Sequence, residues 1–297
     1  MTSTPAMSPK AIGKKRLSPP APPSRELLLR DMLAQTGRLG VPIRRRFLQT
    51  LTPNQNGLSA GPMSKMLRAR DSSTLDAFLL IHAMASSSEP YDAFYFSNTW
   101  VRLMRFDQGA EASAASSRWA KTITRLEKMN LVKRDRHGNN MHYLLLDEAG
   151  DAAPYSRPTK LSHGRWFSIP HAYWLDGYDH SLSTPEKVML LIALDQPDGF
   201  NLPYERAAQW YGLSASTAKR GLTGLVSRGI LSAESTWVVS GKSATGWIEV
   251  RRYTTVGIWS KPSRDQAMKT RPKKRTPIVF EELAANDKEV VKTKQLA

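Results

Sequence analysis

The sequence predicts a mainly α-helical α+β protein in which one order of helices and a small β-hairpin occurs twice. Two segments, 116–132 and 215–231, carry this prediction because they share one pattern of apolar and basic residues. In both segments, apolar residues at helical spacing mark a buried face, and the opposite face is basic and hydroxylic. A short apolar strand then begins, at Leu131-Val132 in the first segment and at Ile230-Leu231 in the second.

The first module is expected over residues 72–148. Ser73 or Thr74 can cap its first helix, and the polar run His137–Asn140 between alternating arms predicts a hairpin. The expected elements are a helix bearing Leu75, Phe78, Leu79, His82 and Ala83, a strand at Phe94–Phe96, a helix over Thr99–Phe106, a loop over Gly109–Ala115, the helix of segment 116–132, and hairpin arms at 131–136 and 141–146.

The second module is expected over residues 166–260. Ser183 or Thr184 can cap its first helix, and Pro185 takes the first helical position, where proline is favoured. The expected elements are that helix with Val188, Leu191 and Ile192 inward, a short strand at Phe200 and Leu202, a helix over Tyr204–Tyr211, a helix after Ser214, and hairpin arms at Trp237–Val239 and Trp247–Tyr253.

The rest of the chain is expected to connect or flank these modules. Residues 1–24 are rich in Pro, Ser and Ala and predict a disordered basic tail, and residues 25–71 predict a helical extension followed by a loop. Residues 149–165 contain Gly150, Pro154 and Pro158 and predict a linker. Residues 261–297 predict a second basic, mostly disordered tail.

Composition favours a polyanionic partner. The chain has 297 residues and a formal net charge of +17, which favours nucleic acid over other partners. It has no Cys, so disulfides and thiolate metal sites are excluded. No apolar run is suited to a signal peptide or a membrane span, and we therefore expect a cytoplasmic, nucleoid-associated protein that does not bind membrane.

The sequence contains no pattern that indicates an enzyme, a metal site or a cofactor. Gly241-Lys242-Ser243 resembles the end of a phosphate-binding loop, but Thr236 stands where that motif needs a glycine and a strand is expected to follow. The six His residues form no HExxH motif, and no Ser-His-Asp arrangement is evident. We therefore expect a protein without catalytic activity or cofactor.

Residues 208–222 resemble a bacterial helix-turn-helix motif. Ala208 is small where two helices would cross, Gly212 suits a tight turn that needs positive φ, and Ser214 can cap the following helix. Together with the hairpins, this motif resembles winged-helix DNA-binding domains. The fold expected from the resemblance is two tandem winged-helix domains between disordered basic tails.

The exposed face of the second module's third helix is the strongest candidate for DNA contact. No Asp or Glu occurs from Arg206 to Ala233, so nothing on this helix would repel phosphate. We expect Arg220 to contact a base and Lys219 to contact phosphate. The full candidate set in this module is Ser216, Thr217, Lys219, Arg220, Thr223 and Ser227 on the helix, with Lys242, Arg251 and Arg252 on the hairpin.

The first module offers a looser version of the same surface. The loop before its third helix is longer than a plain helix-turn-helix turn, and the module could instead serve packing or dimerisation. The candidate residues are Arg118, Lys121, Thr122, Arg125 and Lys128 on the helix, with Arg134 and Arg136 on the hairpin.

Within the winged-helix class, the chain resembles the replication initiators of plasmids and phages, which join two such domains. That resemblance implies sequence-specific binding of double-stranded DNA at an origin, with host replication proteins and a homodimer as further partners. Two alternatives stay open, a winged-helix transcriptional repressor and an architectural or partition protein that binds DNA. The two glycines inside the helix, Gly221 and Gly224, depart from the expected pattern, since each costs about 1 kcal/mol against Ala.

Overall fold

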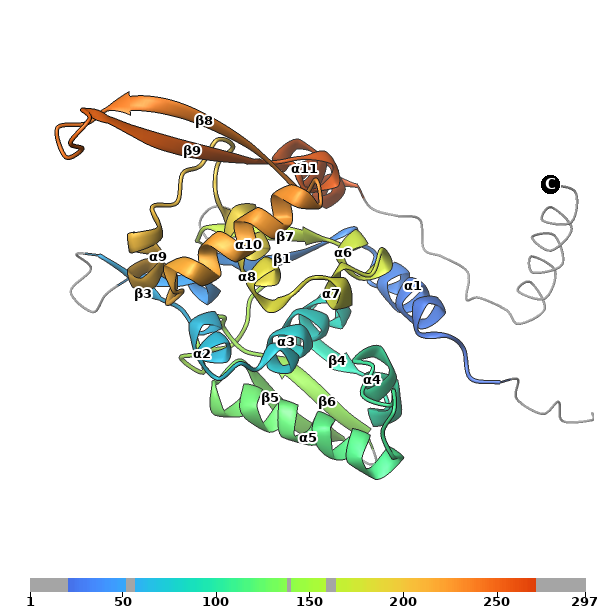
Figure 1. Cartoon of the computed structure of the whole chain (residues 1–297). Helices are drawn as coiled ribbons and strands as arrows, with labels where there is room; N and C mark the ends of the chain where they lie inside the picture. Colours follow the sequence, from blue (N-terminus) through green and yellow to red (C-terminus); the bar gives the residue numbers. More distant parts are fainter. Residues whose placement is uncertain (1–20, 52–56, 138–139, 159–163, 271–297) are drawn as a thin grey trace, which may run out of the picture. The chain divides into compact units, whose positions relative to one another are not determined.

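The computed structural model describes residues 21–51, 57–137, 140–158 and 164–270. Contacts group Arg25–Thr276 into one compact unit, and the description below concerns the described residues of that unit. The predicted disorder of residues 1–20 and 271–297 lies outside the described residues. Figure 1 shows the order and placement of the elements.

The N-terminal half of the unit alternates short strands with helices. Its elements are α1 (Arg25–Gln35), β1 (Gly40–Arg44), η1 (Arg45–Phe47), β2 (Gln49–Leu51), β3 (Leu58–Ala60), α2 (Met63–Arg68), α3 (Ser72–Met84), β4 (Asp92–Phe94), α4 (Ser97–Leu103), α5 (Ala112–Lys128), β5 (Val132–His137) and β6 (Asn140–Leu145). Helix α5 begins at Ala112, so the prediction of a loop up to Ala115 is wrong by one helical turn.

The C-terminal half has a buried helix, a helix pair and a long hairpin. Its elements are β7 (Trp166–Pro170), α6 (Ala172–Leu175), α7 (Tyr178–Ser181), α8 (Thr184–Asp195), α9 (Tyr204–Tyr211), α10 (Ala215–Ser227), β8 (Leu231–Val239), β9 (Trp247–Thr255), η3 (Gly257–Trp259) and α11 (Lys261–Lys269). The strand expected at Phe200 and Leu202 is reduced to a single bridge between Phe200 and Tyr253.

The strands of the described residues form four small antiparallel sheets. Strands β4, β6 and β5 form a three-stranded sheet in that order, and β2–β3 and β8–β9 are two-stranded hairpins. The fourth sheet joins β1 to β7, from the Gly40–Pro170 pair to the Arg44–Trp166 pair. This last sheet links the segment expected to be an extension to the beginning of the expected second module.

The prediction of a mainly α protein built from two tandem winged-helix domains is wrong. The structure is a mixed α+β unit, and residues 25–71 are part of its core instead of a flanking extension. The basic tail expected from Lys261 begins as helix α11, in which Arg264 is buried and donates from Nε to the carbonyl of Trp259. The periodicity of apolar residues did not reveal that residues 25–71 belong to the core, because the β1–β7 pairing joins residues far apart in sequence.

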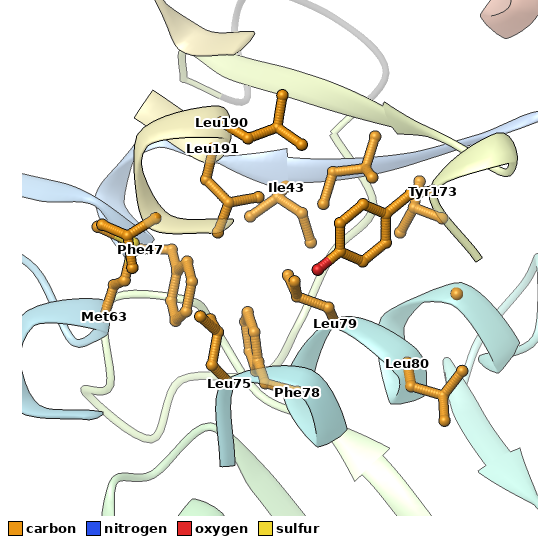
Figure 2. Packing of buried hydrophobic residues seen from close by; sticks show 14 of the residues in the cluster. Ile43, Phe47, Met63, Leu75, Phe78, Leu79, Leu80, Tyr173, Leu190 and Leu191 are labelled. Atoms are coloured by element: carbon orange, nitrogen blue, oxygen red, sulfur yellow. The ribbon is translucent and has the colours of Figure 1, made fainter. Parts of the chain in front are cut away.

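One hydrophobic cluster extends through both halves of the unit. Figure 2 shows Phe47, Phe78, Leu191 and Tyr173 among the side chains of this cluster, so η1, α3, α8 and α6 contribute to the same packing. The rings of Phe47 and Phe78 are stacked with centroids 4.2 Å apart. Burial of side chains of this size contributes about 1.5–3 kcal/mol each, so separating the halves would expose a costly surface.

Helix α8 lies at the centre of this packing because its sequence is apolar on every face. All seven residues from Val188 to Leu194 are at most 2% exposed. The helix starts as predicted, with Pro185 in its first turn and a capping box in which Ser183 and Glu186 bond each other's backbone amides. A helix that is apolar all round must be covered on all sides, which explains its central position.

A buried ion pair joins β1 to the segment after β6. Arg44 donates from Nη1 to Glu148 at 2.7 Å, and its backbone amide donates to the same carboxylate at 3.1 Å. Glu148 is fully buried, and burial raises the pKa of its carboxyl although the Arg44 guanidinium opposes this. Arg44 also lies over the ring of Tyr155, 5.4 Å from its centroid.

His171 gives the unit a predictable response to acid. The side chain is 5% exposed, and burial, helped by the charge of Arg38, lowers its pKa to about 3. Because this pKa lies below the unfolded value of about 6.5, neutral His171 contributes fully to the free energy of unfolding above pH 6.5. This contribution is lost as the pH falls towards 3. Between about pH 7.5 and about pH 5, wild type should lose roughly 2 kcal/mol more stability than His171→Gln.

Urea denaturation of both proteins at the two pH values measures this difference. His137→Gln serves as the control because His137 is exposed, and it should follow wild type. If wild type and His171→Gln lose the same free energy of unfolding between the two pH values, His171 is not held neutral by burial.

Candidate nucleic-acid interface

The turn between α9 and α10 forms as its sequence predicts. Gly212 ends α9 in the left-handed region with φ +68°, and a Cβ there would lie 2.7 Å from Cβ of Ser64. Leu213 is fully buried beneath the turn. The hydroxyl of Ser214 accepts from the amide of Thr217 at 3.2 Å and caps α10, which is worth about 1 kcal/mol.

The two glycines of α10 are explained by helix α8. A Cβ on Gly221 would lie 2.9 Å from Cβ of Met189 and would overlap the carbonyl oxygen of Pro185 more severely. Gly221 therefore allows α10 to cross α8 closely. Gly224, which had no explanation from the sequence, faces the Glu186 side chain, where a Cβ would lie 2.8 Å from Cγ.

The Glu186 carboxylate thus packs directly against Gly224, and it is already paired. Arg228 donates from Nε to Glu186 at 2.8 Å, and the Ser183 amide donates to the other carboxylate oxygen at 2.7 Å. Partial burial alone would raise the pKa of Glu186, but these hydrogen bonds hold it below its usual value. The negative charge under α10 is therefore matched by Arg228 at the end of the helix.

The outer face of α10 is open to solvent. Ala218, Leu222 and Leu225 are buried, whereas Lys219 and Arg220 are exposed. Neither cation has an ion pair with any other residue that the structure describes. Of the remaining candidates on this helix, Ser216, Thr223 and Ser227 are exposed and Thr217 is half-buried.

Three of the four hydroxyl candidates, Ser216, Thr217 and Ser227, already have hydrogen-bonding neighbours on the helix. The Ser214 hydroxyl lies 3.0 Å from that of Ser216 and 2.8 Å from that of Thr217. Ser227 donates to the carbonyl of Gly224 at 2.8 Å. A phosphate would have to compete with these bonds, so Lys219 and Arg220 are the stronger contacts on this face.

The hairpin after α10 is longer than its sequence predicted. Strand β8 begins at Leu231 and pairs with β9 through nine residue pairs, from Leu231–Thr255 to Val239–Trp247. Lys242 lies in the connecting turn and is exposed. Arg251 lies over the ring of Tyr253, 5.7 Å from its centroid, and Arg252 donates to the carbonyl of Gly199 at 3.3 Å.

The outer half of this hairpin carries exposed apolar side chains that the sequence analysis did not single out. The exposed fractions are 68% for Trp237, 72% for Val239 and 50% for Trp247, and Val238 and Ile248 are each 41% exposed. The alternating apolar pattern predicted strands but could not show that the core covers only the base of the hairpin.

The corresponding face of α5 is less available. Arg118, Lys121, Arg125 and Lys128 are exposed. Arg125 pairs with Asp71 at 3.0 Å, and the Arg118 guanidinium lies over the Phe106 ring, 4.4 Å from its centroid. The predicted place of Thr122 in the exposed stripe is wrong, because this residue is 2% exposed and its hydroxyl donates to the Arg118 carbonyl.

One of the two candidate cations of the β5–β6 hairpin also has an ion-pair partner within the protein. Arg134 pairs with Glu127 of α5, and this bond raises the pKa of Arg134 above its usual value. Arg136 is exposed. Residues 138 and 139, at the predicted tip, lie outside the described residues. Arg118, Arg125 and Arg134 are thus engaged by neighbouring groups. Lys219 and Arg220 of α10, like Lys121 and Lys128 of α5, have no ion pair with any residue that the structure describes.

Two other kinds of feature, a metal cluster and a membrane-spanning helix, are absent from the described residues. No group of three or more His, Asp or Glu side chains in the described ranges is arranged to hold a metal ion. None of the described helices is long and apolar enough to cross a membrane. Comparison with known proteins adds nothing, since no family model, curated protein or solved structure matches the chain.

Proposed function

We propose that this protein binds double-stranded DNA by placing the exposed face of α10 in the major groove. The observation that carries the proposal is the pair Lys219 and Arg220, exposed on a helix whose opposite face is buried. The sequence around this helix, from Arg206 to Ala233, contains no acidic residue. The major groove admits an α-helix, and guanidinium groups pair with guanine there.

The helix is held in a way that suits insertion into a groove. Its buried face packs on α8 at Gly221, and its N-terminus is fixed by Gly212 and the Ser214 cap. A rigid support keeps contacting side chains in place and lowers the entropic cost of binding. The net charge of +17 adds a non-specific attraction to phosphate, so binding should weaken steeply with salt.

Arg220→Ala tests the specific part of this proposal. Loss of a base contact should weaken binding to the preferred site by about 1–3 kcal/mol, or roughly 5- to 150-fold, and relax preference at one base position. The measurement is fluorescence anisotropy with DNA selected by wild type from a random pool.

The control is Arg30→Ala, because Arg30 is an exposed cation on α1. It should change affinity much less than Arg220→Ala does. If Arg220→Ala weakens binding equally on every DNA sequence, Arg220 contacts phosphate. If wild type forms no complex with any duplex in dilute buffer, DNA binding itself is refuted.

A footprint on DNA from the gene's own neighbourhood would define the biological role of this binding. Protected direct repeats would favour replication initiation, and a protected palindrome at the promoter would favour transcriptional regulation. Uniform protection without a preferred site would favour an architectural role.

A further inference from the structure

Strand β8 has an open edge along its length. In the described residues β8 pairs with β9 alone, and the far side of β9 is met at its base by Phe200, whose carbonyl accepts from the Tyr253 amide at 2.8 Å. The hairpin therefore has a partly covered edge at β9 and an uncovered edge at β8. An uncovered edge presents unpaired amides and carbonyls that can bind another strand.

The direction of these amides follows from the register. Tyr253 donates away from β8, so its partner Ala233 belongs to a pair without mutual hydrogen bonds. Such pairs alternate along an antiparallel ladder. The amides of Ser235, Trp237 and Val239 therefore also point outward from β8.

The outer part of β8 lacks the features that usually protect an edge strand. The seven residues from Ser235 to Gly241 include no charged residue and no proline. Trp237 and Val239 on one face, and Val238 on the other, are exposed. Proteins commonly place charges, prolines or bulges at such edges to prevent pairing between chains.

We propose that β8 pairs antiparallel with β8 of a second copy of this chain, forming a four-stranded sheet in a two-fold symmetric dimer. The charges at the ends of the uncharged run select this partner and this direction. Glu234 precedes the run and Lys242 follows it. Antiparallel pairing brings Glu234 of one copy to the Lys242 end of the other, whereas parallel pairing would bring like charges together.

A second copy fits this edge better than a nucleic acid does. Glu249 lies opposite Trp237 in the β8–β9 register. The candidate DNA contacts Arg251 and Arg252 lie on β9 and not on the open β8 edge. Pairing places the exposed apolar side chains of the two β8 strands next to each other on both faces of the sheet. Isologous pairing is also the commonest form of homo-oligomer. The pairing concerns the protein alone and does not depend on DNA binding.

The backbone test uses two prolines on paired residues. Ser235→Pro removes an amide that points to the second copy, while Arg251→Pro removes an amide on the opposite edge of the hairpin, and neither amide joins β8 to β9. Sedimentation velocity without DNA should show wild type and Arg251→Pro as dimers and Ser235→Pro as a monomer. The proposal would be overturned if wild type were still monomeric at about 100 μM, or if the two variants dimerised equally well.

The charge test fixes the direction of pairing. Glu234→Lys and Lys242→Glu should each weaken the dimer about tenfold, and the double variant should return to near the wild-type affinity. Both residues are exposed, so these variants leave the core intact. If the double variant dimerises no more tightly than the single variants, antiparallel pairing through β8 is refuted.

Discussion

Glu148→Gln is expected to lower the free energy of unfolding by about 3–5 kcal/mol, because it leaves the charge of Arg44 uncompensated in the core. The exchange keeps the shape of the side chain, removes its charge and replaces one of its two acceptor oxygens with an NH2 donor. Both oxygens of Glu148 accept from Arg44, so one of these hydrogen bonds is lost as well. Asp147 lies 3.9 Å from the Arg44 guanidinium but is itself bound by Arg46 at 3.0 Å, so it cannot fully replace Glu148. Urea denaturation at neutral pH measures the loss.

The matched control for this prediction is the double variant Arg44→Met/Glu148→Leu. Replacing both members of a buried pair with apolar residues of similar size is often neutral or stabilising. The double variant should therefore be more stable than Glu148→Gln. If Glu148→Gln is as stable as wild type, the Arg44–Glu148 pair does not hold β1 to the segment after β6.

Gly221→Val should destabilise the protein by about 3 kcal/mol, the upper end of the usual cost of overpacking. The new side chain would collide with Met189 and with the Pro185 carbonyl, and a backbone oxygen in the first turn of α8 cannot move as a side chain can. The crossing of α8 and α10 would have to open. Thermal and urea denaturation both report the change.

Thr223→Val is the control because it places the same β-branched residue on the exposed face of α10. It carries the helix-propensity cost of valine without the collision, and it should change stability by less than about 0.5 kcal/mol. Similar losses in the two variants would mean that the α8–α10 crossing tolerates a wider spacing.

Local chemistry made helices α8, α9 and α10 and the turn between α9 and α10 predictable from sequence. Gly212, Ser214 and Pro185 have conformational preferences that act within one turn, and each takes the role that its residue type predicts. The boundaries of α9 matched the expected Tyr204–Tyr211 for the same reason. The apolar face of α10 follows from helical spacing alone.

The parts that the sequence did not predict depend on long-range contacts. Thr122 looks like a surface residue by type, but the packing of α5 buries it together with Trp119 and Leu126. Gly224 has a reason only once Glu186 is placed beneath it. Arg125 looked available for phosphate until folding brought Asp71 within 3.0 Å.

The two-domain prediction was wrong for the same reason. Repeated local patterns indicated two independent modules, and nothing in the β1 segment Gly40–Arg44 indicates that its partner is Trp166–Pro170. A strand's pairing partner is set by tertiary packing, which periodicity does not encode. The described residues instead share one core across both repeats.

The β1–β7 sheet has a consequence for synthesis on the ribosome. Strand β1 is translated more than a hundred residues before the strand that completes its hydrogen bonds. The N-terminal half therefore cannot reach its final state as it emerges, and its apolar surface stays exposed until β7 has left the exit tunnel. Chaperone dependence during expression should accordingly be concentrated in the interval between these two strands.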